Sequence, residues 1–204
     1  MPLFRSKAED KVRAAGFDPA RLPPGQYFTE KWPVLHAGEV PEVDVATWTL
    51  RVYGEVEQEL SLTYDELRAL PATDVTTDIH CVTRWSRFDA QFRGVHWREL
   101  EKLCRPKPTA NFVIEHAEHG FTTNVPIASL RDDEHALVVY EADGAPLTAE
   151  HGGPVRLVVP SKYFWKSAKW LTGIELSSID KPGFWERYGY HNEADYWQEQ
   201  RYGF

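Results

Sequence analysis

One segment of the chain places a cysteine among residues that could make it reactive. Cys81 follows the β-rich run from Asp74 to Ile79 and is flanked by His80, Arg84 and Arg87. Positively charged neighbours favour the thiolate, which is the form that attacks electrophiles or binds soft metals. A buried, unreactive cysteine at the end of a strand is also compatible with this pattern. The segment alone therefore indicates either a reactive thiolate or a core residue.

A second segment contains residues suited to binding a phosphate group. His151 is followed by two glycines and a proline, then by Arg156, and further on by Ser167 and Lys169. Glycines allow a ligand to approach the backbone closely, and an arginine can hold a phosphate through two parallel hydrogen bonds. The segment is neither a Walker loop nor a dinucleotide-binding fingerprint. A simple turn would carry a similar pattern.

The composition limits the classes of protein to which the chain can belong. It has 204 residues, of which 42% are hydrophobic and 26% charged, as is typical of one folded domain. The net charge of −8 argues against a nucleic-acid partner, so an anionic ligand would need a local cluster of Arg and Lys. Two cysteines, Cys81 and Cys104, cannot form a four-thiolate zinc or iron–sulfur site. We found no export signal or membrane-spanning stretch, and therefore expect a cytoplasmic chain without a membrane partner.

The elements that must position these residues form a mixed α+β pattern. We expect a helix ending near Gly16, and residues 1–26 are assigned to this helix and a linker. Thr63 and Glu66 form a capping-box signature for a short helix that Pro71 ends. A further helix is expected at 97–104, and strands at 47–54, 74–79, 111–116, 136–140, 155–160 and 169–176. We predict one domain over residues 27–204, with a mixed β-sheet and interspersed helices.

In combination, the two chemical segments resemble the sulfite-oxidase-like molybdopterin oxidoreductases. Arg156 follows His151 after four intervening residues, and the pair Ser167 and Lys169 begins eleven residues after Arg156. The run from Gly183 onward is similar to the short, single-domain bacterial branch of that family. The resemblance implies the sulfite-oxidase molybdopterin-binding fold and molybdenum bound by Cys81. It also implies a molybdopterin whose phosphate end is bound by His151, Arg156, Ser167 and Lys169.

Further site residues follow from the resemblance, with alternatives. Lys31 and Trp32 occupy the place of an arm that contacts the pterin, although the residue types differ from the family pattern. His116 falls where relatives place another pterin contact, but could equally be an ordinary surface or core histidine. Arg84 is the candidate catalytic arginine, and Trp85 stands where the family would have a second arginine. Sulfite is therefore not established as the substrate.

The function indicated is a molybdenum-dependent oxidoreductase that transfers an oxygen atom to or from a small oxo or sulfur-containing substrate. Such an enzyme would exchange electrons with a partner. One alternative is a metal-free module that binds the pterin or a phosphate without catalysis. Another is a thiol-based redox protein that uses Cys81 and Cys104. The histidines lack the i, i+4 spacing typical of a zinc hydrolase.

Overall fold

The computed structural model describes residues 7–203, which form two β-sheets with short helices between their strands. The first sheet has the order β1-β5-β8-β10, with β4 paired to β5 and β9 to β8. Its strands are β1 (Tyr27–Phe28), β4 (Ala72–His80), β5 (Trp85–His96), β8 (Leu137–Ala142), β9 (Ala145–Pro146) and β10 (Arg156–Val158). All its pairings are antiparallel except that of β1 with β5.

The second sheet has the order β3-β2-β11-β6-β7. Its strands are β2 (Thr49–Gly54), β3 (Leu60–Thr63), β6 (Phe112–Ala117), β7 (Thr122–Pro126) and β11 (Leu171–Ser177). Strand β11 runs parallel to β2 and antiparallel to β6. The mixed α+β class predicted from the sequence is confirmed.

Short helices connect and cover these sheets. They are α1 (Lys7–Ala14), α2 (Tyr64–Ala69), α3 (Trp97–Cys104), α4 (Ala128–Arg131) and α5 (Phe184–Arg187), with 3₁₀ turns at Pro19–Arg21, Glu118–Gly120, Ala149–His151 and Phe164–Lys166. The capping box of α2 is present, with the Thr63 hydroxyl accepting from the N–H of Glu66. Within residues 7–203, no helix has the length and apolar character needed to cross a membrane.

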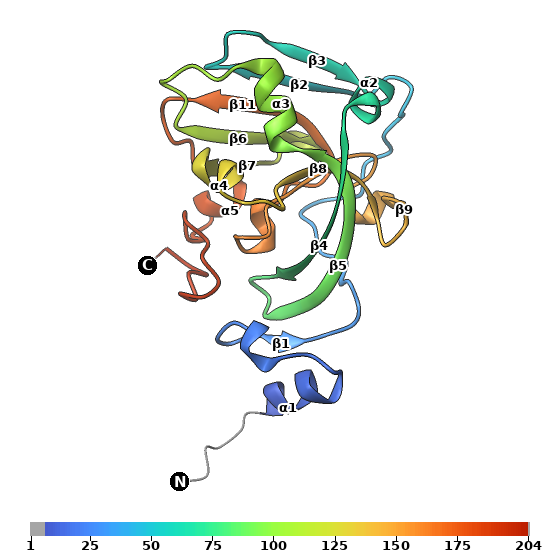
Figure 1. Cartoon of the computed structure of the whole chain (residues 1–204). Helices are drawn as coiled ribbons and strands as arrows, with labels where there is room; N and C mark the ends of the chain where they lie inside the picture. Colours follow the sequence, from blue (N-terminus) through green and yellow to red (C-terminus); the bar gives the residue numbers. More distant parts are fainter. Residues whose placement is uncertain (1–6, 204) are drawn as a thin grey trace.

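The long β4–β5 pair joins the second sheet and its helices to the N-terminal α1 and β1, as Figure 1 shows. The core is divided in two. One cluster packs β2, β6 and β11 against α3, and the other surrounds the end of β4. This second cluster contains Cys81 together with aromatic residues such as Trp85, Phe92 and Tyr163. The cysteine therefore lies at the edge of an aromatic core.

Candidate functional site

A pocket of about 520 Å³ brings the two chemical segments together. One wall is the turn from Cys81 to Thr83 with Trp85, and another is the stretch from Phe164 to Trp170. The extended arm around Trp32 and the aromatic residues near the C-terminus complete the lining. Cys81, Arg156, Ser167 and Lys169 thus border one space, although the sequence separates the cysteine from the others by more than seventy positions.

A tight turn directly after β4 holds Cys81 at the pocket wall. The N–H of Cys81 donates to the carbonyl of Trp85 at 2.9 Å, and the N–H of Arg84 donates to the carbonyl of Cys81 at 2.9 Å. The Thr83 hydroxyl donates to Cys81 Sγ at 3.2 Å. Burial raises the pKa of the thiol, while the Thr83 hydrogen bond and the charge of Arg201 act in the opposite direction. The thiol needs a further positive charge, such as a metal ion, to ionise readily.

The structure differs from the sequence-based expectation about the cationic neighbours of Cys81. Burial lowers the pKa of His80 to about 4, and its Nδ1 lies 2.8 Å from the hydroxyl of Ser86, so the ring is neutral at pH 7. Arg84 is exposed, and Arg87 binds both carboxylate oxygens of Asp143 at 2.8 Å. The arginine that acts on the thiol is instead Arg201, from the far end of the chain.

Arg156 connects the two halves of the predicted phosphate site. Its side chain is buried in β10, where Nη1 donates to the carbonyl of His151 at 2.9 Å and Nη2 to the carbonyl of Ser167 at 2.8 Å. Burial lowers its pKa to about 9, so the guanidinium stays charged at neutral pH. No ion pair joins it to a carboxylate within residues 7–203. The charge is therefore buried without a direct protein counter-ion.

His151 lies within a group of cations. Its ring stacks on that of Trp32, with centroids 4.0 Å apart, and its Nδ1 is buried without a hydrogen-bond partner among the described residues. Burial, followed by the charges of Lys169, Arg156 and Arg87, lowers the pKa of His151 to about 4. We call Arg87, His151, Arg156 and Lys169 the cradle. Within the cradle, Arg87 is paired with Asp143 and His151 is neutral at pH 7, so the positive charge without a carboxylate partner lies on Arg156 and Lys169. That charge suits an anion.

Contacts with the neighbouring backbone hold Lys169 in the cradle. Its Nζ donates to the carbonyl of Glu150 at 2.5 Å, and burial, followed by the charge of Arg156, lowers its pKa to about 7. Gly152 has φ +100°, and a Cβ there would lie 2.8 Å from the Cβ of Lys169. A glycine is needed here because any side chain would push Lys169 out of place.

Buried hydrogen bonds fix the segment that carries Ser167 and Lys169. The Ser167 hydroxyl oxygen accepts from the N–H of Val159 at 2.9 Å. The N–H of Ala168 donates to Glu115 Oε2 at 2.7 Å. Burial raises the pKa of Glu115 to about 8. Glu115 was not singled out from the sequence, and nothing in its local pattern identifies it.

Four residues predicted for the site are not in the lining of this pocket: Lys31, Arg84, His116 and His151, of which His151 stacks on the lining residue Trp32. Lys31 is exposed and outside the pocket lining, whereas its neighbour Trp32 is part of that lining. His116 faces a separate hollow of about 540 Å³, and its Nε2 lies 3.0 Å from Glu175 Oε2. The structure therefore brings Trp32 to the cradle but not Lys31 or His116. Arg84 is also outside the lining.

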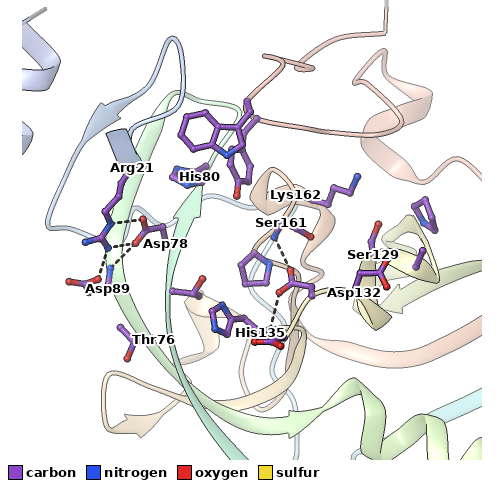
Figure 2. A pocket seen from close by; sticks show the side chains of 18 of the residues that line it. Arg21, Thr76, Asp78, His80, Asp89, Ser129, Asp132, His135, Ser161 and Lys162 are labelled. Carbon is purple, nitrogen blue, oxygen red and sulfur yellow. Dashed lines mark hydrogen bonds and ion pairs between the residues drawn. The ribbon is translucent and has the colours of Figure 1, made fainter. Parts of the chain in front are cut away.

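A third hollow, of about 970 Å³, lies on the other side of the β4 end and is drawn in Figure 2. Figure 2 shows Arg21 between the carboxylates of Asp78 and Asp89, with His80 beside them. Because side chains alternate along a strand and its extension, His80 borders this hollow while Cys81 borders the pocket. The adjacent residues His80 and Cys81 therefore line different cavities.

The residues present fit a cofactor that joins a metal to a flat ring and a phosphate. Within residues 7–203, Arg156 and Lys169 are cations without an ion pair to a carboxylate, and His151 Nδ1 lacks a hydrogen-bond partner. Aromatic side chains dominate the lining between the cradle and the turn at Cys81, including Trp32, Phe164 and Trp165. Such side chains suit a planar organic ring.

Comparison with known proteins identifies the family. The model of the oxidoreductase molybdopterin binding domain matches residues 37–185. An uncharacterized oxidoreductase of Bacillus subtilis, YuiH, is 47% identical, over 89% of this chain and 92% of its own length. Rat mitochondrial sulfite oxidase is 27% identical, over 82% of this chain but only 37% of its own length.

The fold agrees with this similarity. The sulfane dehydrogenase SoxCD of Paracoccus pantotrophus superimposes with a TM-score of 0.66 at 21% identity, covering 76% of this chain and 43% of that one. The chain belongs to the sulfite-oxidase-like molybdopterin oxidoreductases, and molybdenum-bearing molybdopterin is its cofactor.

Proposed function

We propose that Cys81 is the protein ligand to molybdenum and that the enzyme transfers an oxygen atom to or from a small oxo or sulfur-containing substrate. The observation that carries this proposal is that Cys81 borders one pocket with Arg156, Ser167 and Lys169. A soft thiolate suits a metal already bound by sulfur. When bound, the cofactor supplies the two-electron redox chemistry.

The protein's own residues would bind and orient the cofactor. Arg156 and Lys169 would hold the phosphate end, and the neutral His151 beside them would offer its ring nitrogen as a hydrogen-bond partner. Trp32 stacks on His151 and would cover that end against water. Burial raises the pKa of Cys81, so a bound metal ion would supply the positive charge that favours the thiolate.

Arg84 was the candidate catalytic arginine, and its exposed position outside the lining gives this role no support. Arg201 is the better candidate for charge near the thiolate. Its Nη1 donates to the carbonyl of Val82 at 2.8 Å, and its Nη2 to Gln26 Oε1 at 2.8 Å. These bonds tie the C-terminal segment to the turn that presents Cys81.

The test compares Cys81→Ser with Cys104→Ala in protein produced in a host that makes molybdopterin. We expect Cys81→Ser to retain pterin through the cradle and to lose oxygen-atom transfer, with one sulfur ligand fewer in the molybdenum X-ray absorption spectrum. Cys104→Ala should keep both the spectrum and the activity. Wild-type activity in Cys81→Ser would overturn the assignment of the ligand. Absence of molybdenum from the wild type would favour a metal-free module.

A further inference from the structure

The hollow drawn in Figure 2 carries negative charge that the protein does not balance. Its lining includes Asp132, Asp133 and Glu134, and none of these three carboxylates forms an ion pair within residues 7–203. The backbone N–H groups of His135 and Ser161 donate to the carboxylate of Asp133 at 2.9 and 3.0 Å. Asp132 and Glu134 are exposed, and their carboxylates have no hydrogen-bond partner in the same part of the chain. The hollow therefore offers free carboxylates to a cation.

Among the described residues, the lining of this hollow contains two cations, and both have partners. Arg21 pairs with Asp78 and Asp89. Lys162 Nζ lies 3.6 Å from Glu193. The free carboxylates do not form a metal site either, since the residues that the structure describes contain no group of three His, Cys, Asp or Glu side chains able to hold a metal ion. Negative charge spread over an open hollow of about 970 Å³ instead suits the positive side chains of a partner protein.

Aromatic rings connect this hollow to the residue next to Cys81. Trp197 lines the hollow and is 51% exposed, and its ring centroid lies 5.8 Å from that of Tyr196. The ring of Tyr196 lies 4.3 Å from that of His80, which precedes Cys81 in the chain. Exposed tryptophan is typical of protein interfaces. Electron transfer slows steeply with distance, so a chain of closely packed rings favours it over a path through water.

One polar atom that borders the hollow lacks a partner. His80 is 2% exposed, and its Nδ1 lies 2.8 Å from the hydroxyl of Ser86. Its Nε2 has no hydrogen-bond partner among the described residues. Figure 2 shows the side chain of His80 beside the hollow. A buried polar nitrogen without a partner is unfavourable, and a polar side chain inserted by a docked protein would satisfy it.

We propose that this hollow is the docking surface for a one-electron carrier protein with a positively charged contact face, and that Trp197, Tyr196 and His80 connect the carrier to Cys81. The inference rests on the proposed function, in which Cys81 binds the metal. When a substrate gains an oxygen atom, water supplies the atom, two protons are released, and two oxidised carriers are each reduced by one electron. Removal of an oxygen atom from a substrate reverses this balance. The carrier therefore docks apart from the pocket that Cys81 lines.

The first experiment measures electron transfer from the loaded enzyme, reduced with titanium(III) citrate, to oxidised cytochrome c. Native cytochrome c serves as a basic one-electron protein, and its succinylated form, in which lysines become carboxylates, serves as the acidic control. We expect the second-order rate constant at low ionic strength to be at least about tenfold higher for the native form, and to fall as salt is added. Equal rate constants for the two forms would overturn the inference.

Two double variants separate the charge of the hollow from the charge of the whole chain. Asp132→Asn with Glu134→Gln removes two of the free carboxylates. Asp65→Asn with Glu59→Gln removes the same charge elsewhere on the surface, from exposed residues that form no ion pair within residues 7–203. The first variant should slow transfer to native cytochrome c about tenfold at low ionic strength, whereas the second should leave the rate constant unchanged. Equal effects would overturn the assignment of the hollow.

Substitution of Trp197 tests the aromatic route. Trp197→Phe keeps a ring at this exposed position, whereas Trp197→Leu removes it. We expect the limiting first-order rate at saturating cytochrome c to fall in Trp197→Leu and to be retained in Trp197→Phe, with molybdenum content and Tm unchanged in both. A limiting rate in Trp197→Leu equal to that of the wild type would overturn the route.

The failure of the two proposals can be told apart. A loaded enzyme that reduces both forms of cytochrome c equally contradicts the docking surface alone. A protein that holds no molybdenum contradicts the proposed function, and calorimetric titration with oxidised cytochrome c then tests the surface. Binding should be weakened only by Asp132→Asn with Glu134→Gln, and a wild type that does not bind would overturn the inference. A dimer in sedimentation that only this variant dissociates would assign the hollow to a second copy of the chain instead.

Discussion

Lys166 and Lys169 are three positions apart, the first buried and the second half-buried, and their surroundings differ. Lys166 Nζ lies 2.7 Å from Glu186 Oε1 and donates to the carbonyl of Asn124 at 2.7 Å. Lys169 Nζ donates to the carbonyl of Glu150, and a cation, Arg156, acts on it. The protein supplies a counter-ion for Lys166, whereas no ion pair with a carboxylate is present for Lys169 within residues 7–203.

This difference indicates that the charge of Lys166 stabilises the fold, whereas the charge of Lys169 is available to bind a ligand. A buried ion pair is costly to break because the remaining partner stays buried and uncompensated. A buried cation without a carboxylate is costly to keep, and a phosphate would relieve that cost. The comparison therefore predicts that changes near Lys166 affect stability and that changes in the cradle affect cofactor retention.

The largest effect on stability is expected for Lys166→Met. The side chains of Lys166 and Glu186 are 1% and 2% exposed, so the substitution leaves a buried carboxylate without its partner. We expect the free energy of unfolding to fall by about 3–5 kcal/mol, measured by urea denaturation. The double variant Lys166→Met with Glu186→Gln should recover part of this loss. A single variant as stable as the wild type would show that the pair does not support the fold.

A smaller effect is expected for Cys104→Ala, which contrasts with Cys81. Cys104 is fully buried at the end of α3, and burial raises its pKa to about 11. Its loss should cost about 1–2 kcal/mol as a small cavity, measured by denaturation, and leave molybdenum bound. Loss of molybdenum from this variant, measured by elemental analysis, would contradict the assignment of Cys81 as the metal ligand and Cys104 as a core residue.

A pH-dependent effect is expected for Glu115, whose carboxylate contacts Ala168 between Lys166 and Lys169. Its folded-state pKa of about 8 exceeds the value of 4.5 for an exposed glutamate, so the folded protein binds the proton more tightly. Its contribution to stability is full below pH 4.5 and is lost as the pH rises to about 8, by at most about 1.4 kcal/mol per pH unit.

Glu115→Gln should remove this pH dependence in the apoprotein, because an amide oxygen can still accept from Ala168 without titrating. The measurement is urea denaturation of both proteins at a series of pH values between 5 and 8. An equally steep decline in stability for Glu115→Gln would assign the titration to another group.

Several elements were predictable because their local signals were complete. The helix at 97–104 was predicted with the bounds of α3, and Thr63, Glu66 and Pro71 delimited α2. The twelve-residue β5 was not predicted, although it is central to the first sheet. Its alternation is present in the sequence, since Asp89, Gln91 and Arg93 point outward between the buried Phe88, Ala90 and Phe92, and the sequence-based prediction missed it. The helix predicted for the start of the chain extends into residues 1–6, outside those described.

For the site, order and spacing in the sequence were sufficient to bring Cys81, Arg156, Ser167 and Lys169 to one pocket. They were insufficient where the outcome depends on which face of a strand a residue occupies. His116 was predicted as a contact, but adjacent side chains on a strand alternate, and it is Glu115 that reaches Ala168. Arg87 joins the cradle and Arg201 reaches the cysteine turn only through tertiary packing, for which the local sequence has no signal.

The most direct test of this account is the amount of pterin retained per folded chain in Arg156→Ala, compared with Arg68→Ala on the exposed surface. A charge-assisted hydrogen bond contributes about 1.5–3 kcal/mol, so Arg156→Ala should weaken retention at least about tenfold. Arg156→Lys should restore only part of it, since an ammonium lacks the planar fork. Arg68→Ala should retain wild-type pterin. Full occupancy in Arg156→Ala would contradict the account and make Arg156 a buried residue of the fold alone.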